Sequence, residues 1–333
     1  MRMSRFKWKN LEIKCAVALA LALVLALTLT AALAGCGAGG GAGGAGNGAG
    51  ATQAVELVDM VGREVRLEAP ATRVVVLAAA DCEILFAIGA GDLIVGRGTY
   101  CDYPPEALEL PEVASGGETN IEQIIALTPH VAILAKMAQS EEHAEELENA
   151  GVRVIVTDAQ DIESTYAAIR LVGDVVGMGS EAETLAGQMR DALREVSEDA
   201  ARAKAELGAD FGETAYFEVS PIEHGLWTTG AGTFMNELAA LVGMENAFAD
   251  IEGWAAISEE QVIMRDPYYI VSIAMYFGDG PPPVDEIMGR AGWQGMKALM
   301  AGRVSHVDSD AFARPGPRLV DAARELFSIF YGS

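Results

Sequence analysis

Two segments that start 138 residues apart have nearly the same sequence, NIEQIIALTPHVAIL from Asn120 and SEEQVIMRDPYYIVS from Ser258. The coincident pairs are Glu122 and Glu260, Gln123 and Gln261, Ile125 and Ile263, and Pro129 and Pro267. Asn and Ser are favoured helix N-caps. Each copy therefore predicts a capped short helix, a proline-marked turn and a buried strand. The repeat indicates two similar lobes, each presenting a glutamate at the same place.

Two explanations account for these glutamates, and the residues alone leave both open. A carboxylate in the first turn of a helix is stabilised by the helix dipole by about 0.3 to 1 kcal/mol, and Thr119 to Glu122 has the spacing of a capping box. Capping does not require the same Glu-Gln pair at the same offset in both halves. Docking on a two-fold symmetric partner would account for this duplication.

Apolar strands alternate with helical stretches along most of the chain. After a hairpin over 55–67, we expect strands at 73–77, 93–96, 131–134, 152–157, 214–219, 269–273 and 304–307. Between and after them, helical periodicity covers 81–88, 121–127, 141–150, 162–176, 234–242, 259–264, 293–300 and 318–331. This alternation predicts an α/β fold with mostly parallel sheets covered on both faces.

One helical stretch is much longer than the others. Residues 180–207 contain no proline and have apolar positions at helical spacing. We expect a single rigid helix here, acting as a spine between an N-terminal lobe at 54–179 and a C-terminal lobe at 209–333, with the spine segment at 180–208.

The N-terminus predicts export. An apolar run over 15–34 ends in Leu33-Ala34-Gly35-Cys36, and its basic flank consists of Arg2, Arg5, Lys7, Lys9 and Lys14. Leu-Ala-Gly-Cys resembles the lipobox of bacterial lipoproteins, so we expect a signal peptide over 1–36, with lipidation of Cys36. A retained transmembrane helix is the alternative, because about 20 apolar residues span a bilayer. Both place the domain outside the cytoplasm and tethered to the membrane.

The segment after Cys36 and the overall charge restrict the partners further. Residues 37–53 are rich in Gly and Ala and predict a flexible linker. Beyond Cys36 the chain carries 18 Lys and Arg against 47 Asp and Glu, a net charge of −29. This charge disfavours nucleic acid and anionic lipid surfaces as partners. Past this segment, only Cys82 and Cys101 remain as a possible disulfide pair.

Several motifs resemble the Fe/B12 periplasmic-binding family, the substrate-binding proteins of ABC importers for iron–siderophores, haem and vitamin B12. In the first half they are Glu83-Ile84-Leu85-Phe86-Ala87-Ile88-Gly89-Ala90-Gly91-Asp92 and Tyr100-Cys101-Asp102-Tyr103-Pro104-Pro105. In the second half they are Gly253-Trp254, Ser258-Glu259-Glu260-Gln261-Val262, Asp266-Pro267 and Arg314-Pro315-Gly316-Pro317-Arg318. The resemblance covers about 55–331. It implies a class III periplasmic-binding-protein-like fold, with two lobes on a rigid helix and the ligand between them.

The resemblance implies roles for particular residues. In this family an acidic residue at the tip of each lobe docks on arginines of the permease dimer, and the matching positions are Glu122 and Glu260, with Glu259 as a neighbour able to share the task. Expected ligand-binding positions are the aromatics Tyr100, Trp227 and Trp254 and the polar residues Arg314, Asp310, Lys136 and Arg97. Ordinary packing or solvation explains each ligand position equally well by itself.

Departures from the family pattern bear on the ligand. Gly116 and Ala135 stand where the better-known B12 binders have tryptophans, so the cleft has less stacking surface. This places a ferric siderophore slightly ahead of haem or a corrinoid.

Other classes of function receive less support. The four histidines are His130, His143, His224 and His306, and they form no cluster that would suit zinc or manganese. Only His224, near Trp227, is a possible cleft residue. The chain has no G-x-S-x-G elbow, phosphate-binding loop or H-E-x-x-H motif, which disfavours an enzyme. A surface receptor that binds the same ligand without transport is a further alternative.

We therefore expect a monomeric lipoprotein, without a cofactor, that captures a metal chelate between its lobes. Slight closure about the spine and docking on an ABC permease dimer with its ATPase subunits would follow. A continuous helix resists bending, so the closure is expected to be small.

Overall fold

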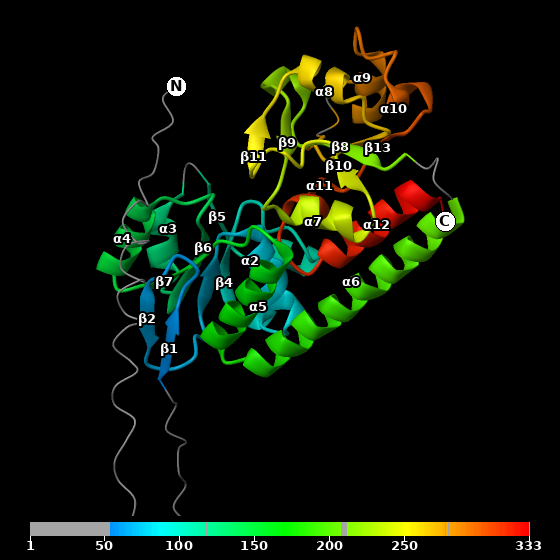
Figure 1. Cartoon of the computed structure of the whole chain (residues 1–333). Helices are drawn as coiled ribbons and strands as arrows, with labels where there is room; N and C mark the ends of the chain where they lie inside the picture. The colour runs from blue at the N-terminus through cyan, green and yellow to red at the C-terminus, as the bar shows by residue number, and fades with distance from the viewer. Residues whose placement is uncertain (1–53, 117–118, 208–211, 277, 279, 333) are drawn as a thin grey trace, which may run out of the picture. The chain divides into compact units, whose positions relative to one another are not determined.

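The computed structural model describes residues 54–116, 119–207, 212–276, 278 and 280–332 (Figure 1). The expected signal peptide, Cys36 and the Gly/Ala linker lie outside this part of the chain. No helix in it is long and apolar enough to cross a membrane. The helices are α2 (Ala79–Ala87), α3 (Ile121–Ala126), α4 (Glu141–Asn149), α5 (Ile162–Val176), α6 (Gly179–Leu207), α7 (Phe234–Leu241), α8 (Glu259–Arg265), α9 (Pro283–Gly289), α10 (Lys297–Met300), α11 (Ser309–Ala313) and α12 (Leu319–Tyr331), with short 3₁₀ turns η1 (Gly91–Leu93), η2 (Pro105–Glu109) and η3 (Ile222–His224). The strands are β1 (Val55–Val58), β2 (Glu64–Leu67), β3 (Val74–Val76), β4 (Ile94–Gly98), β5 (Glu112–Val113), β6 (Val131–Ala135), β7 (Arg153–Thr157), β8 (Thr214–Glu218), β9 (Trp227–Thr229), β10 (Glu245–Asn246), β11 (Trp254–Ala256), β12 (Tyr269–Ser272) and β13 (Val304–His306).

The chain begins with the predicted hairpin, in which β1 pairs antiparallel with β2. The buried Asp59 holds its turn, because its Oδ1 accepts hydrogen bonds from the backbone N–H of Val61 at 3.2 Å and of Arg63 at 2.9 Å. Its Oδ2 accepts from the N–H of Val156 in β7, at 3.1 Å. One carboxylate therefore shapes the hairpin and anchors it to the first sheet.

The first sheet has the strand order β5-β4-β3-β6-β7, and every pairing in it is parallel. Side chains of a strand alternate between the two faces of a sheet. In β3, Val74 and Val76 pack into one hydrophobic cluster and Val75 packs into another, and all three are fully buried. Helices therefore cover both faces, as the run of consecutive valines predicts.

The second sheet is organised in the same way. Its order is β10-β8-β12-β13, again with parallel pairings. In β8, Phe217 belongs to the cluster that also contains Val74 and Val76, whereas Tyr216 belongs to a separate cluster under α8, α9 and α10. The predicted α/β architecture with mostly parallel sheets is confirmed.

A single hydrophobic cluster joins the inner faces of the two sheets. It contains Ile133 from β6 and Val271 from β12, together with buried residues of α5, α6, α7 and α12. Close packing makes such an interior resistant to deformation. The two lobes therefore share a core.

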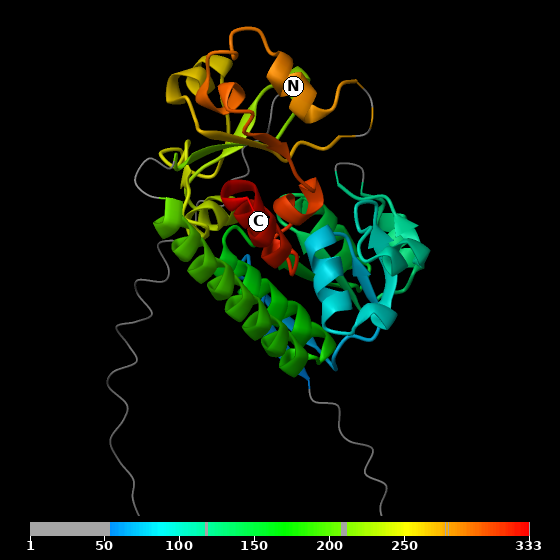
Figure 2. The ribbon, with the colours of Figure 1, turned by 90° about the vertical axis from the view of Figure 1, so that its right-hand side faces the viewer.

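The long helix α6 lies along this shared core (Figures 1 and 2). It packs against α5 in the first half of the chain and against α12 and α7 in the second. At 1.5 Å per residue its length is about 43 Å. Its buried residues recur at intervals of three and four positions, which forms one apolar stripe: Ala182, Ala186, Met189, Leu193, Val196 and Ala200.

The expectation of a helix over 293–300 is wrong in its first half, because only α10, Lys297–Met300, is helical. Gly292 has a φ of +85°, and its N–H donates to the side chain of Gln294 at 3.1 Å, so a turn precedes the helix. Trp293, placed on a helix by its apolar periodicity, is instead a fully buried core residue in this turn. Sequence periodicity also missed the short elements β5, β9, β10, β11, α9 and α11.

Candidate functional site

The repeated segments form equivalent elements at one end of each sheet. Asn120 caps α3, its Oδ1 accepting from the N–H of Gln123 at 3.0 Å, and Ser258 caps α8 in a capping box with Gln261. The expected box from Thr119 to Glu122 is wrong, because the Thr119 hydroxyl donates to the carbonyl of Gly116.

Each of these helices ends in the same unusual backbone conformation. Thr128 and Asp266, the residues before the two prolines, have φ values of +48° and +43°. Among the described residues they are the non-glycine positions with positive φ. The left-handed region is strained for residues with a side chain. The repeat therefore extends from the N-cap to the left-handed residue at the end of each helix.

The two tips present matching side chains to solvent. Glu122 and Glu260 are both exposed, and the apolar Ile125 and Ile263, one helical turn further on, are 36% and 37% exposed. Hydrogen bonding from Ser258 lowers the pKa of Glu260. The neighbouring Glu259 is occupied, because its Oε2 accepts from the Trp293 indole at 2.9 Å. Glu260 is thus the exposed carboxylate of the second tip.

The cationic ligand candidates are engaged with protein carboxylates. The buried Arg314 lies 3.1 Å from Glu83, 2.7 Å from Asp102 and 2.8 Å from Asp310. Burial lowers the pKa of Arg314, but hydrogen bonding to Asp102 and Glu83 and the charges of Asp310 and Asp102 together outweigh it, so the net shift is upward and the group stays charged. Arg318 adds two contacts to Glu83, at 3.0 and 2.7 Å. This cluster joins α2 to the start of α12.

The other two candidate cations are paired as well. Lys136 Nζ lies 2.5 Å from Asp158 Oδ2. The buried Arg97 lies 3.1 Å from Glu112 and donates to the carbonyl of Gly98. These contacts neutralise the cations that were expected to meet an anionic ligand.

The three aromatic candidates differ in exposure. Tyr100, in the loop after β4, is 57% exposed, and Trp227, at the start of β9, is 39% exposed. Trp254 is half-buried at the start of β11 and packs edge-on against Phe234, with ring centroids 5.8 Å apart. Its indole N–H is buried and has no hydrogen-bond partner among the described residues. Tyr100 and Trp227 thus offer faces for stacking.

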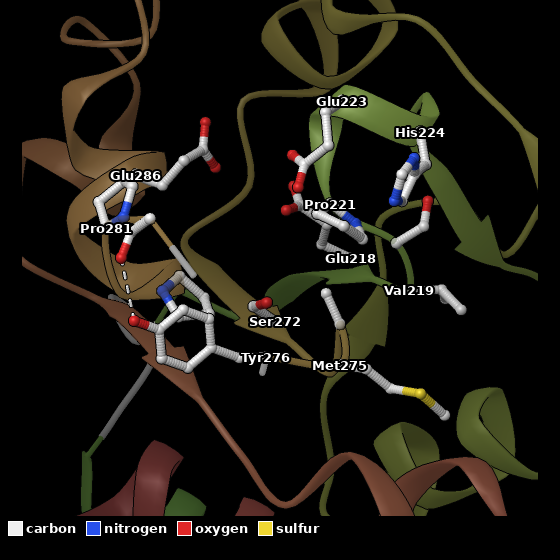
Figure 3. A pocket seen from close by; sticks show the side chains of 14 residues that line it. Glu218, Val219, Pro221, Glu223, His224, Ser272, Met275, Tyr276, Pro281 and Glu286 are labelled. Atoms are coloured by element: carbon white, nitrogen blue, oxygen red, sulfur yellow. Dashed lines mark hydrogen bonds between the residues drawn. The ribbon is translucent and has the colours of Figure 1, made fainter. Parts of the chain in front are cut away.

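The structure adds a pocket of about 750 Å³ in the second lobe (Figure 3). It lies where β8 and β12 end, the edge at which open parallel sheets bind ligands. Its lining consists of Glu218, Val219, Ser220, Pro221, Glu223, His224, Ser272, Ala274, Met275, Tyr276, Gly280, Pro281, Pro283 and Glu286. The volume is typical of sites for small molecules.

The floor of the pocket is an ion-paired carboxylate. Glu218 and Arg290 are both buried, and two parallel contacts of 2.6 and 2.8 Å join them. Arg290 also contacts Glu286 at 2.5 Å. Burial raises the pKa of Glu218 above its ordinary value, against the lowering effect of Arg290.

Beside this pair lies Ser272, which is opposite Glu218 in the β12–β8 register. Its Oγ is fully buried and has no hydrogen-bond partner within the described part of the chain. Buried polar groups in folded proteins are nearly always satisfied. In Figure 3 the hydroxyl lies in the middle of the pocket lining, where a bound molecule would reach it.

Sequence reasoning found part of this region and missed the rest. His224 lines the pocket, and Trp227 is next to it, because its carbonyl accepts from the Val219 N–H at 2.9 Å. Glu218 and Ser272 were missed, although each is the last residue of its strand. The carboxyl-end rule points to this edge of the sheet, but the expected strands end one residue later, at Val219 and Ile273.

Cys82, Cys101 and Gly116 were also singled out from the sequence. Cys82 and Cys101 are buried free thiols, and hydrogen bonding with Cys101, together with burial, raises the pKa of Cys82. Gly116, in place of an expected tryptophan, has a φ of +88°, which favours glycine. In the described ranges no group of three or more His, Cys, Asp or Glu side chains is arranged to hold a metal ion.

Known proteins resemble this chain over most of its length. The family model described as periplasmic binding protein matches residues 74–311. An uncharacterized ABC transporter substrate-binding lipoprotein, YvrC, from Bacillus subtilis (strain 168) is 31% identical over 83% of this chain and 85% of its own. The vitamin B12-binding protein of Pectobacterium carotovorum subsp. carotovorum (strain PC1) is 28% identical over 77% of this chain and 87% of its own. The structure of a periplasmic heme-binding protein from Roseiflexus sp. RS-1 superposes with a TM-score of 0.68, at 25% identity, over 78% of this chain and 97% of that one.

Proposed function

Because the chain belongs to the periplasmic binding protein family, whose members bind solutes and are not enzymes, we propose that it is the substrate-binding lipoprotein of an ABC importer. Its cargo is a metal chelate, with a ferric siderophore slightly ahead of a corrinoid or haem. Its similarity to proteins named for vitamin B12 and heme supports this class of cargo. The signal-like N-terminus supports anchoring through a lipid on Cys36, outside the cytoplasmic membrane.

The observation that carries the proposal is the matched pair of tips. Glu122 and Glu260 occupy the same position on equivalent capped helices, and each has an exposed isoleucine one turn further on. Two fixed carboxylates suit two symmetry-related guanidinium groups, which they would orient by charge-assisted hydrogen bonds. A monomer with duplicated tips thus matches a dimeric permease.

The shared core supports delivery with little internal motion. Hinge closure requires a few residues to absorb a large backbone rotation. Here the inner cluster continues from one sheet to the other, and the N–H of Ile162 donates to Glu237 across the same junction at 2.7 Å. We expect ligand to change the radius of gyration only slightly in solution scattering. A rotation of tens of degrees on binding would contradict this.

The decisive test separates capture from delivery. In cells that carry the cognate importer, Glu122→Ala combined with Glu260→Ala should reduce uptake of the bound chelate more than about tenfold, which corresponds to a loss of 1.4 kcal/mol or more in docking. Chelate affinity, measured by quenching of Trp227 and Trp254, should stay unchanged. The control is the double variant Glu142→Ala with Glu195→Ala, which removes two exposed carboxylates elsewhere. Normal uptake by the tip variant would rule out the docking role.

A further inference from the structure

The pocket at the ends of β8 and β12 carries an excess of negative charge. Its lining includes the carboxylates Glu218, Glu223 and Glu286, and the one guanidinium in contact with them is Arg290, within the part of the chain that the structure describes. Three carboxylates against one guanidinium leave two negative charges. The net charge of this lining therefore repels an anion.

Most of the hydrogen-bonding capacity of Arg290 is used within the protein. Its Nε contacts both oxygens of Glu286, at 2.9 and 3.1 Å, and its two terminal nitrogens contact Glu218. Its side chain is only 3% exposed, and its guanidinium also packs on the ring of Trp293. The positive charge is thus directed into the protein and away from the cavity.

Glu223 is the charge that remains open to the cavity. It is exposed on η3, and its side chain makes no hydrogen bond or ion pair with the other described residues. In Figure 3 its carboxylate lies on the same side of the pocket as Glu218, above Ser272. Ionised carboxylates only accept hydrogen bonds. A ligand that binds on this side of the pocket should therefore present N–H or O–H donors.

The rest of the lining suits the body of a chelate. Met275, Pro221, Pro281 and Val219 provide apolar walls, and the Tyr276 hydroxyl is already used in donating to the carbonyl of Gly280 at 3.0 Å. The unpartnered Ser272 hydroxyl can both donate and accept. An amide group of a ligand would suit both side chains, because its N–H can donate to the Glu223 carboxylate and its carbonyl can accept from the Ser272 hydroxyl.

From these contacts we infer that the pocket binds chelates of neutral or positive charge that carry amide or amine N–H groups, and that it discriminates against anionic chelates. The inference rests on the proposed function and narrows its cargo. Neutral or cationic hydroxamate siderophores and amide-rich corrinoids fit this chemistry. Tricatecholate siderophores, citrate complexes and haem with ionised propionates do not.

A ligand series that changes charge alone tests this inference. Ferrioxamine B carries a free ammonium beside its iron trihydroxamate, its N-acetyl derivative is neutral, and its N-succinyl derivative is anionic. Cobalamin and its monocarboxylate, formed by hydrolysis of one side-chain amide, make a second series. In whichever series binds, tryptophan quenching should show that affinity falls as the ligand charge becomes more negative. At low salt, the most positive and the most negative ligand of a series should differ in affinity by about tenfold or more. This difference should shrink as added salt screens the charges.

Variants assign the discrimination to the pocket. Glu223→Gln should reduce the cation-to-anion ratio several-fold, and Glu223→Lys should reverse the order. Ser272→Ala should weaken all amide-bearing members alike. Glu195→Gln on α6 makes the same charge change far from the pocket in sequence and should leave the ratio as it is.

The outcomes separate the two proposals. Tighter binding of the anionic members, or a charge preference that Glu223→Gln and Glu223→Lys leave intact, would overturn this inference and keep the proposed function. Absence of binding by every chelate, including tricatecholates and haemin, to protein with intact circular dichroism would overturn both.

Discussion

The two lobes carry the same element at their outer ends and differ at their inner ends. In the first lobe, protein partners occupy the charged groups near the strand ends: Lys136 pairs with Asp158, and Thr157 donates to Asp81 at 2.7 Å. In the second lobe, the strand ends open into a pocket with the free carboxylate of Glu223 and the unsatisfied hydroxyl of Ser272. The proposed docking element is thus duplicated, whereas the proposed site of ligand recognition is found in one lobe alone among the described residues.

The strongest way to disturb the second lobe is to remove the partner of its buried carboxylate. Arg290→Ala leaves Glu218 buried without a counter-charge, so we expect a loss of about 3 to 5 kcal/mol in the free energy of unfolding. Denaturant titration measures the effect. The matched control is Arg66→Ala in the first lobe. It breaks the ion pair between Arg66 and Glu56, whose side chains are 61% and 69% exposed, and it should lower the free energy of unfolding by less than about 1 kcal/mol.

Asp81 is a buried carboxylate of the first lobe that has no cationic partner among the described residues. Burial raises the pKa of Asp81 from 3.8 to about 7. The folded state thus binds this proton more tightly than the unfolded state, so its contribution is fully present below pH 4 and is lost as the pH rises through 7. Asp81→Asn keeps the bond to Thr157 and should raise stability by up to about 4 kcal/mol at pH 8. An equal gain at pH 4 would contradict this account.

The capped tips allow a direct comparison between the lobes. Asn120→Ala and Ser258→Ala should each cost about 1 kcal/mol. In the second tip the Ser258 N–H also donates to Gln261 Oε1 at 2.9 Å, but this bond uses the backbone and survives Ser258→Ala, so the two changes should cost about the same. Thermal melts of the two variants check this, and a clearly larger shift for either one would contradict it.

The smallest effect concerns the strained residues before the prolines. Thr128→Gly should stabilise the protein by up to about 1 kcal/mol, because glycine adopts positive φ without strain. Asp266→Gly should not, since Asp266 Oδ1 accepts from the Lys297 N–H at 2.8 Å and its carboxylate pairs with the Lys297 ammonium at 3.2 Å. Equilibrium unfolding would distinguish them, and a gain in both would mean that these bonds have little value.

The sequence predicted those features that depend on neighbours along the chain. The caps at Asn120 and Ser258, the stripe of α6 and the buried valines of β3 all follow from local spacing. Glu218 and Ser272 come together only through the register between β8 and β12, which no local pattern records. Arg314 and Glu83 are 231 positions apart, so their pairing could not be anticipated. Trp293 was misassigned because an apolar residue in a buried turn has the same periodicity as one on a helix.

The ion pairs between Glu83 and the arginines that precede α12 also have a consequence for folding. Residues from the last 20 positions of the sequence complete a contact with α2, the first helix of the described residues, at a separation of 231 to 235 residues. Contacts of high sequence separation slow folding, because a long loop must close before they form. A chain still emerging from a ribosome or a translocation channel therefore has its earliest lobe incomplete until synthesis is nearly over, and a truncation before Arg314 would leave Glu83 buried with no positive partner.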